Sequence, residues 1–291
     1  VEATPSWNPW DDIESQDKID YYNDGLVGWS GVFGQVEYTN EIISAFVQGS
    51  VSNQAFQRVE YFNELPEDQK SVKENIAGGN IKGGINYNIN ENNNVFFNTG
   101  YYSKQPKFDA VFINYGNNLN PDIVNEQIVG VELGYGYRSA DFSANANLYR
   151  TSWADRFVTS GVTLNAGEDN EFRGTANYQG ITQVHIGLEI DFLWRVLDNL
   201  SITGMASFGN WQYEGDTDAD IYDEGQNYIG TTTLYLDGVK VGDAAQTTAA
   251  LGANYTFFKN FNAGLNWRYA SNLYAAIDVT DFDKEDNDGS L

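Results

Sequence analysis

The sequence predicts an all-β fold, an antiparallel up-and-down β-barrel that crosses a membrane, and three observations carry that prediction. Apolar and polar residues alternate over long segments, as in Asn125 to Trp153. These segments join in pairs through tight polar turns, whereas the connections between pairs run for about 20 to 35 residues. The long connections all fall at the same edge of the predicted sheet. Short turns at one end and long loops at the other are typical of outer-membrane barrels.

The hairpin from 127 to 153 shows the alternation most clearly, with the period of two that a strand requires. Its first strand sets Val129, Val131, Leu133, Tyr135 and Tyr137 against Gly130, Glu132, Gly134 and Gly136. After the turn, the second strand sets Phe142, Ala144, Ala146 and Leu148 against Ser143, Asn145, Asn147 and Arg150. We therefore expect an apolar face toward lipid, with every strand charge on the opposite face toward a wet lumen.

The same pattern predicts five hairpins, and therefore ten strands of a larger barrel, most of them long enough to cross a bilayer. Their ranges are 27–38 with 41–52, 80–90 with 95–103, 127–138 with 141–153, 182–195 with 199–213, and 247–258 with 261–271. Their turns are Thr39-Asn40, Glu91 to Asn94, Arg138 to Asp141, Val196 to Asp198 and Lys259-Asn260. The connections 53–79, 104–126, 154–181 and 214–246 are expected to be irregular chain.

Composition narrows the class of protein further. The formal net charge of −25 argues against nucleic acid as a partner, because phosphates require clustered Lys and Arg. The absence of Cys removes disulfides, thiol catalysis and zinc–thiolate sites. Aromatic residues make up 15% of the chain, and many lie near predicted strand ends, as expected of interfacial girdles. No apolar stretch approaches the length of a transmembrane helix.

Two alternatives share parts of this pattern. A passive, porin-like channel would have the same barrel. A soluble, secreted carbohydrate-binding β-sandwich would instead pack the apolar register between two sheets, which would enclose Val129, Leu133, Leu188 and Leu265. Sandwich strands are usually about 5 to 6 residues long, and nothing in that fold places every long loop at one edge.

A set of short motifs lies in order between Thr99 and Tyr135. An aromatic residue and Ser end a strand, Pro with an aromatic residue follows, and Asn-Pro and an acidic residue then precede a strand ending in Glu-x-Gly-Tyr. The residues are Tyr102, Ser103, Pro106, Phe108, Asn120, Pro121, Glu126, Glu132, Gly134 and Tyr135. This order resembles the middle of a TonB-dependent outer-membrane receptor barrel, although Asn125 stands where the family often has Pro. The segment 146–157 continues the resemblance, and 263–278 resembles the late barrel of receptors from Bacteroidota.

The resemblance implies a Gram-negative outer-membrane protein with a 22-stranded barrel and an N-terminal plug. Residues 1–291 would form part of the barrel domain, with the plug domain and the final strand absent from this sequence. The implied partners are outer-membrane lipid, TonB acting through a missing N-terminal segment, a small solute such as a glycan or siderophore, and a surface lipoprotein. The implied function is nutrient uptake driven by TonB-derived energy. No nucleic acid, cofactor or enzymatic activity is expected.

Candidate binding residues are aromatic side chains on the predicted loops and rim, because irregular chain on a rigid scaffold carries recognition. They are Tyr115, Tyr178, Trp211, Tyr213, Tyr222, Tyr228 and Tyr274. The run from Asp216 to Asp220 has the alternating carboxylates of a calcium loop, but Ile221 stands where an EF-hand requires Gly. We therefore predict no metal site and no catalytic residues.

Overall fold

The computed structural model describes residues 22–62, 64–164, 172–223, 225–258 and 261–275. Ten strands form the main path of the sheet: β1 (Asn23–Thr39), β2 (Ile43–Glu60), β3 (Glu74–Asn90), β4 (Asn93–Lys104), β5 (Glu126–Arg138), β6 (Phe142–Leu164), β7 (Phe172–Leu197), β8 (Leu200–Tyr213), β11 (Ala245–Phe257) and β12 (Phe261–Leu273). The remaining elements are β9 (Thr217–Asp223), β10 (Tyr228–Leu234), the one-turn helix α1 (Phe108–Val111) and the 3₁₀ helix η1 (Ile113–Tyr115). No helix among these residues is long and apolar enough to cross a membrane.

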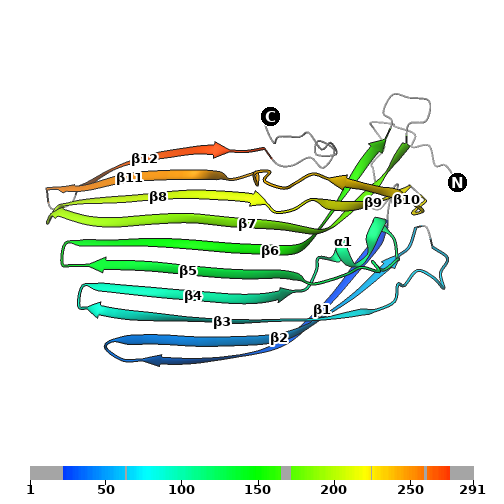
Figure 1. The fold of residues 1–291 in the computed structure, drawn as a ribbon, viewed down its shortest axis with the longest axis horizontal. Helices are drawn as coiled ribbons and strands as arrows, with labels where there is room; N and C mark the ends of the chain where they lie inside the picture. Colours follow the sequence, from blue (N-terminus) through cyan, green and yellow to red (C-terminus); the bar gives the residue numbers. More distant parts are fainter. Residues whose placement is uncertain (1–21, 63, 165–171, 224, 259–260, 276–291) are drawn as a thin grey trace.

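The ten strands lie side by side in chain order, and each is antiparallel to the next (Figure 1). This arrangement confirms the predicted up-and-down topology and all five predicted hairpins. Asn40 explains the first turn, because its side-chain Oδ1 accepts hydrogen bonds from the backbone N–H groups of Ile42 and Ile43 at 2.8 and 2.7 Å. The turn at 259–260 lies outside the described residues.

All four connections expected to be irregular contain regular structure, and in 53–79 this is the end of β2 and the start of β3. The connection 154–181 is largely strand, because β6 and β7 extend to Leu164 and from Phe172, past a register shift at Asp155, whose φ is 57°. The connection 214–246 contains the β9–β10 hairpin, with β9 paired to β7. The connection 104–126 contains α1 and η1. We call α1, η1, β9, β10 and the ends of β2, β6 and β7 beside them the rim.

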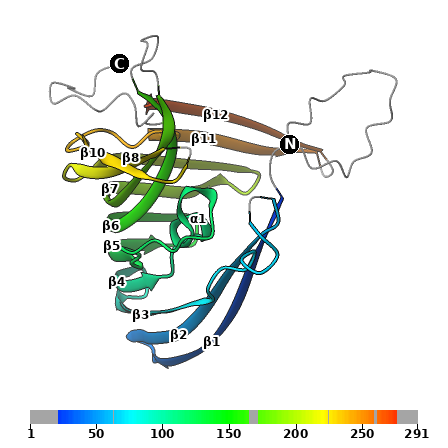
Figure 2. The same ribbon diagram turned by 90° about the vertical axis from the view of Figure 1, so that its right-hand side faces the viewer.

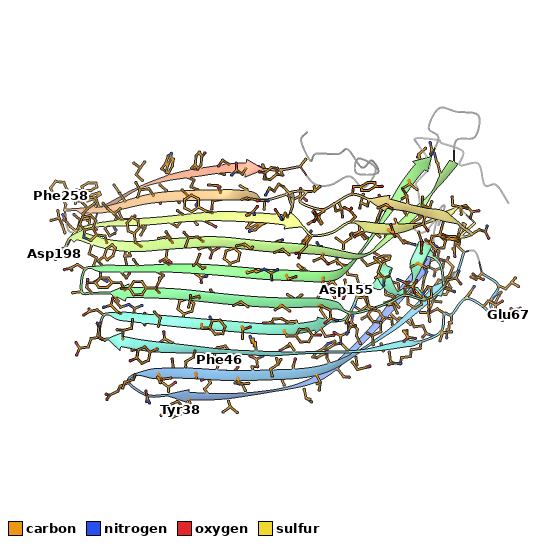
Figure 3. The ribbon with its side chains drawn as sticks, in the orientation of Figure 1. Tyr38, Phe46, Glu67, Asp155, Asp198 and Phe258 are labelled. Carbon is orange, nitrogen blue, oxygen red and sulfur yellow. The ribbon has the colours of Figure 1, made fainter. Side chains whose placement is uncertain are left out.

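The strands between the tight turns and the rim form a wall one sheet thick, with side chains on both sides (Figure 3). One face carries the predicted apolar register in the open, with Val129 41%, Leu133 54% and Leu265 75% exposed. Leu188 is half-buried. Because the described residues form a single sheet, no second layer covers this face, and the β-sandwich alternative is not supported.

The curvature of the sheet distinguishes the two faces. Figure 2 shows a trough-like sheet that is not closed, with α1 inside the curve. The ring of Phe108 in α1 lies 6.3 Å from that of Phe56, whose side chain shares its face of the sheet with Asn98 and Glu132. The concave face is therefore the polar register, and the convex face is the apolar one.

The assignment of Arg150 to the polar register was wrong. Arg150 shares the register of Leu148 and pairs with Val131 and Ile186, all of which belong to the convex face. It lies toward the rim end of that face. The rule that all strand charges lie on one face therefore fails at this position.

Buried apolar residues gather in the rim and not in the wall. The larger cluster joins β6, β7, β9, β10 and the segment after β10, and includes Ala176, Tyr178, Ile221, Leu234 and Leu236. The smaller cluster packs Phe56 of β2 against Val111 and Phe112 beside α1. The rim therefore has its own buried apolar core, whereas the wall is a single sheet without one.

Candidate ligand-binding site

The predicted aromatic residues fall into separate environments. Tyr178 is 2% exposed in the larger rim cluster, and Tyr213 packs against that cluster, so both rings support the rim. Tyr274 is half-buried, and its carbonyl oxygen accepts a hydrogen bond from the backbone N–H of Asp243 at 3.2 Å. Tyr115 ends η1. The structure does not bring all seven residues into one site.

Tyr222 and Tyr228 are brought together by the β9–β10 hairpin. Their ring centroids lie 5.9 Å apart, edge to face, and Tyr228 is 57% exposed. Partial burial raises the pKa of Tyr222, and Asp220 and Asp122 raise it further. The Tyr222 hydroxyl therefore stays protonated at neutral pH and remains a hydrogen-bond donor beside an exposed ring.

Trp211 lies away from this pair, on the concave face of β8. Its Nε1–H donates to the hydroxyl of Tyr149 at 2.9 Å, and its ring stacks on His185 with centroids 5.2 Å apart. Gln246 fixes the backbone of Trp211, accepting from its N–H at 3.0 Å and donating to its carbonyl at 2.8 Å. The indole is therefore held in place on the concave side of the sheet.

Sequence reasoning missed a cluster of charged and aromatic residues at the boundary of wall and rim. Glu126 is buried, accepts a hydrogen bond from Trp153 Nε1 at 3.3 Å and forms an ion pair with Lys104. Lys104 and Arg156 both lie over the Trp153 ring, at 5.2 and 4.6 Å from its centroid. The distant positions of these residues in the sequence gave no signal of the contact.

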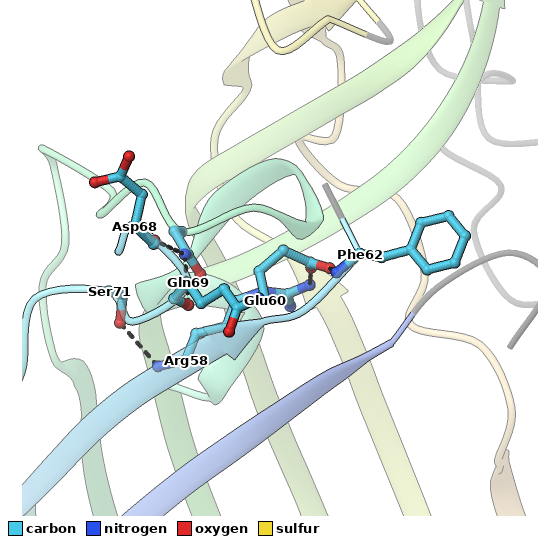
Figure 4. A network of polar contacts seen from close by, with 7 residues as sticks. Arg58, Glu60, Phe62, Asp68, Gln69 and Ser71 are labelled. Atoms are coloured by element: carbon cyan, nitrogen blue, oxygen red, sulfur yellow. Dashed lines mark hydrogen bonds and ion pairs between the residues drawn. The ribbon is translucent and has the colours of Figure 1, made fainter. Parts of the chain in front are cut away.

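A second missed network fixes the rim at β2 (Figure 4). The buried side chains of Arg58 and Glu60 form an ion pair at 2.9 Å. Glu60 also accepts from the backbone N–H of Phe62 at 3.1 Å, and Ser71 Oγ accepts from that of Arg58 at 2.8 Å. The rim therefore buries a positive and a negative charge, and each charge is compensated by the other.

The predicted calcium-like run proves to be a strand. Residues Thr217–Asp223 form β9, so Asp218 and Asp220 accept hydrogen bonds from Thr233 and Thr231 across the hairpin, at 2.8 and 3.2 Å. Within the described part of the chain, no three His, Cys, Asp or Glu residues are grouped so as to hold a metal ion.

With the geometry in place, solved structures define the class of fold. The copper transporter OprC superposes with a TM-score of 0.57 at 14% identity, covering 84% of this chain and 34% of its own. A mutant of the ferric enterobactin receptor PfeA from Pseudomonas aeruginosa matches at 11% identity, covering 83% and 48%, but with a TM-score of 0.31. No protein-family model and no curated protein matches the sequence.

The chain therefore shares its fold with part of the copper transporter OprC, and that fold is the antiparallel up-and-down sheet that the sequence predicts. It spans about a third of the length of OprC. At this level of identity the likeness concerns the fold alone.

Proposed function

We propose that this chain forms part of the barrel of an outer-membrane, TonB-dependent receptor, which captures a scarce solute at its rim and imports it. The chemistry proposed is non-covalent. The larger protein would complete a barrel of about 22 strands around a plug, as expected of this class of receptor. The partners would be lipid around the wall, TonB on the periplasmic side, and a surface lipoprotein at the rim.

The observation that carries the proposal is the uncovered apolar convex face. Val36, Leu133 and Leu265 are 74, 54 and 75% exposed on three different strands, and all three lie on the same face of the sheet. A water-soluble protein rarely leaves a contiguous apolar surface of this extent in solvent. Hydrocarbon tails would cover such a face, whereas the polar concave face would line a wet lumen.

Two features support binding at the rim. The rim is packed around its own buried clusters, so it can hold side chains in fixed positions, and it presents the Tyr222–Tyr228 pair on its outer hairpin. Asparagine side chains also tie the α1 segment to neighbouring strands: Asn120 donates to Gln179 at 3.0 Å and Asn177 donates to Asn114 at 2.9 Å. A rigid, aromatic-bearing rim is suited to solute capture.

Fractionation of cells making the intact protein tests the membrane assignment. We expect the protein in the outer-membrane fraction, released by detergent and not by aqueous buffer. Recovery in buffer without detergent would refute the proposal. A second measurement, solute uptake with and without functional TonB, separates a driven receptor from a passive channel. Uptake that continues unchanged without TonB would favour the channel.

A further inference from the structure

Aromatic rings on the concave face lean over glycine residues of the sheet. A Cβ atom added to Gly187 would lie 2.5 Å from the hydroxyl oxygen of Tyr149, and one added to Gly134 would lie 2.1 Å from Cζ of Phe96. The same relation recurs on other strands of this face. The glycine and ring pairs are Gly31 with Trp29, Gly84 with Phe46, Gly100 with Tyr102, Gly134 with Phe96, Gly187 with Tyr149 and Gly209 with Trp211. Among the described glycines of the convex face, only Gly204 has a ring in this position, that of Phe192.

The glycines determine the orientation of the aromatic rings. With no side chain beneath it, each ring inclines across the sheet and packs on backbone instead of standing upright. Tyr102, Tyr149 and Trp211 are half-buried, so the surface that does not contact the sheet opens into the concavity. Tyr149 and Trp211 are joined by their hydrogen bond, and His185 extends the stack. Tyr102 in β4, Tyr149 in β6 and Trp211 in β8 therefore give the concave face an aromatic surface across these strands.

Polar groups of fixed position surround these rings. A hollow of about 370 Å³ lies on the concave face, and its lining includes Tyr102, Tyr149, Lys82, Asn98, Glu132 and Asn147. Glu132 accepts from the side-chain amides of Asn98 and Asn147 at 2.9 and 2.5 Å, so both amides are oriented. The side-chain Oδ1 of Asn147 is buried without a hydrogen-bond partner among the described residues, so the polar groups offered to an occupant are the other side chains of the lining.

The chemistry of this surface selects its occupant. Inclined aromatic rings favour a ligand with flat C–H faces, and the interleaved carboxylate and amide groups favour one that carries many hydroxyls. Polyanions are disfavoured by Glu132 and Glu189, and a purely apolar ligand would leave the polar lining unpaired. A neutral oligosaccharide satisfies both requirements, because sugar rings alternate C–H faces with equatorial hydroxyls.

We propose that the concave wall across β4 to β8 is a stacking platform for a neutral oligosaccharide, with Tyr102, Tyr149 and Trp211 as the stacking residues. The inference rests on the proposed function and narrows its solute to a carbohydrate. It also makes the lumen wall, and not only the rim, part of the binding surface.

Calorimetric titration of the intact protein in detergent with linear hexasaccharides tests the platform. The probes are the α-1,4-linked and β-1,4-linked hexamers of glucose and the β-1,4-linked hexamer of N-acetylglucosamine. We expect at least one to bind, and Tyr149→Ala and Trp211→Ala each to weaken its binding by about tenfold. Phe192→Ala is the matched control, because it removes a ring that leans over a glycine on the opposite face. Equal losses in all three variants, or no binding of any hexamer at millimolar concentration, would overturn the proposal.

Gly187→Ala separates ring position from ring identity. The added methyl group displaces Tyr149 while every binding side chain remains, so we expect weakened binding comparable to that of Tyr149→Ala. Gly34→Ala is the control, because a Cβ there meets no atom within 4 Å. Full affinity in Gly187→Ala would show that the inclination of the ring is irrelevant to binding and would refute the platform.

A single cysteine reports whether the wall is open to solution. Thr151→Cys lies in the lining of the same hollow, and residues 1–291 contain no other cysteine. We expect a water-soluble maleimide to label it and the bound hexamer to protect it. Failure to label without sugar would mean that polypeptide covers the wall, which overturns the platform. An outer-membrane protein that imports a solute with TonB but binds no hexamer refutes the platform alone, whereas a buffer-soluble protein refutes the proposed function itself.

Discussion

Leucine side chains are mostly exposed in the wall of this protein and buried in its rim. Leu133 in the wall is 54% exposed on the convex face, whereas Leu234 in the rim is 2% exposed within a packed cluster. Every buried hydrophobic side chain among the described residues lies at or beside the rim. The difference shows that the two regions are built for different surroundings, because the rim supplies its own apolar interior and the wall takes its apolar environment from outside.

The largest effect is expected from the buried ion pair of the rim. Glu60→Ala leaves Arg58 buried without its partner, and we expect the unfolding free energy of the rim to fall by about 3–5 kcal/mol. Hydrogen exchange of the β2 end in the folded protein would measure it. The double variant Arg58→Met with Glu60→Leu should recover most of the loss. A cost below about 1 kcal/mol would be that of an exposed pair and would place this part of the rim in water.

A matched pair of leucines sharpens the comparison directly. Leu234→Ala opens a cavity in the rim cluster and should cost about 2–5 kcal/mol. Leu133→Ala should cost less, because acyl chains close over the shortened side chain and leave no cavity. Urea unfolding in phospholipid vesicles measures the wall, and hydrogen exchange of β10 measures the rim. An equal or larger loss at Leu133 would mean that protein, and not lipid, packs on the convex face.

A charge placed on each face of the wall tests which face meets lipid. Leu133→Arg should destabilise the folded protein by about 2–4 kcal/mol if that side chain lies near the middle of the bilayer. Ser207→Arg is the control at similar depth, because Ser207 lies on the concave face opposite Glu189. Reversible unfolding in vesicles gives both values. If Leu133→Arg were tolerated and Ser207→Arg were destabilising, the concave face and not the convex face would be the one that meets lipid.

The smallest effect concerns pH at the tip of the rim hairpin. Backbone and side-chain hydrogen bonds from Asn227 hold the pKa of Asp223 below its ordinary value of 3.8. The carboxylate therefore stabilises the turn above that pH, and the stabilisation is lost as the pH falls through the lowered pKa. We expect exchange of the Asn227 amide hydrogen to accelerate below about pH 4. In Asp223→Asn the acceleration should disappear, and an unchanged profile would show that this carboxylate does not control the turn.

The hairpins of the wall could be predicted because their signal is local. Val129, Val131 and Leu133 alternate with Gly and Glu, and a period of two is sufficient to assign strand and face. The face of Arg150 was predicted wrongly from its charge. The register of the strand determines which face the side chain is on, and that register places Arg150 with Val131 on the convex face. The seven aromatic candidates were chosen by type and place in the chain, and contacts between distant segments decided that Tyr178 is buried and Tyr222 meets Tyr228.

The sequence by itself determined the five hairpins of the main sheet, their order and, apart from Arg150, the two faces of their strands, since each follows from neighbours within a hairpin. Only the tertiary structure decided what the long connections become, since β9 pairs with β7 across about forty residues of chain and the rim clusters join segments still farther apart. It also decided that rings such as Tyr149 and Trp211 incline over glycines, because that arrangement depends on which residue the register sets beneath each ring.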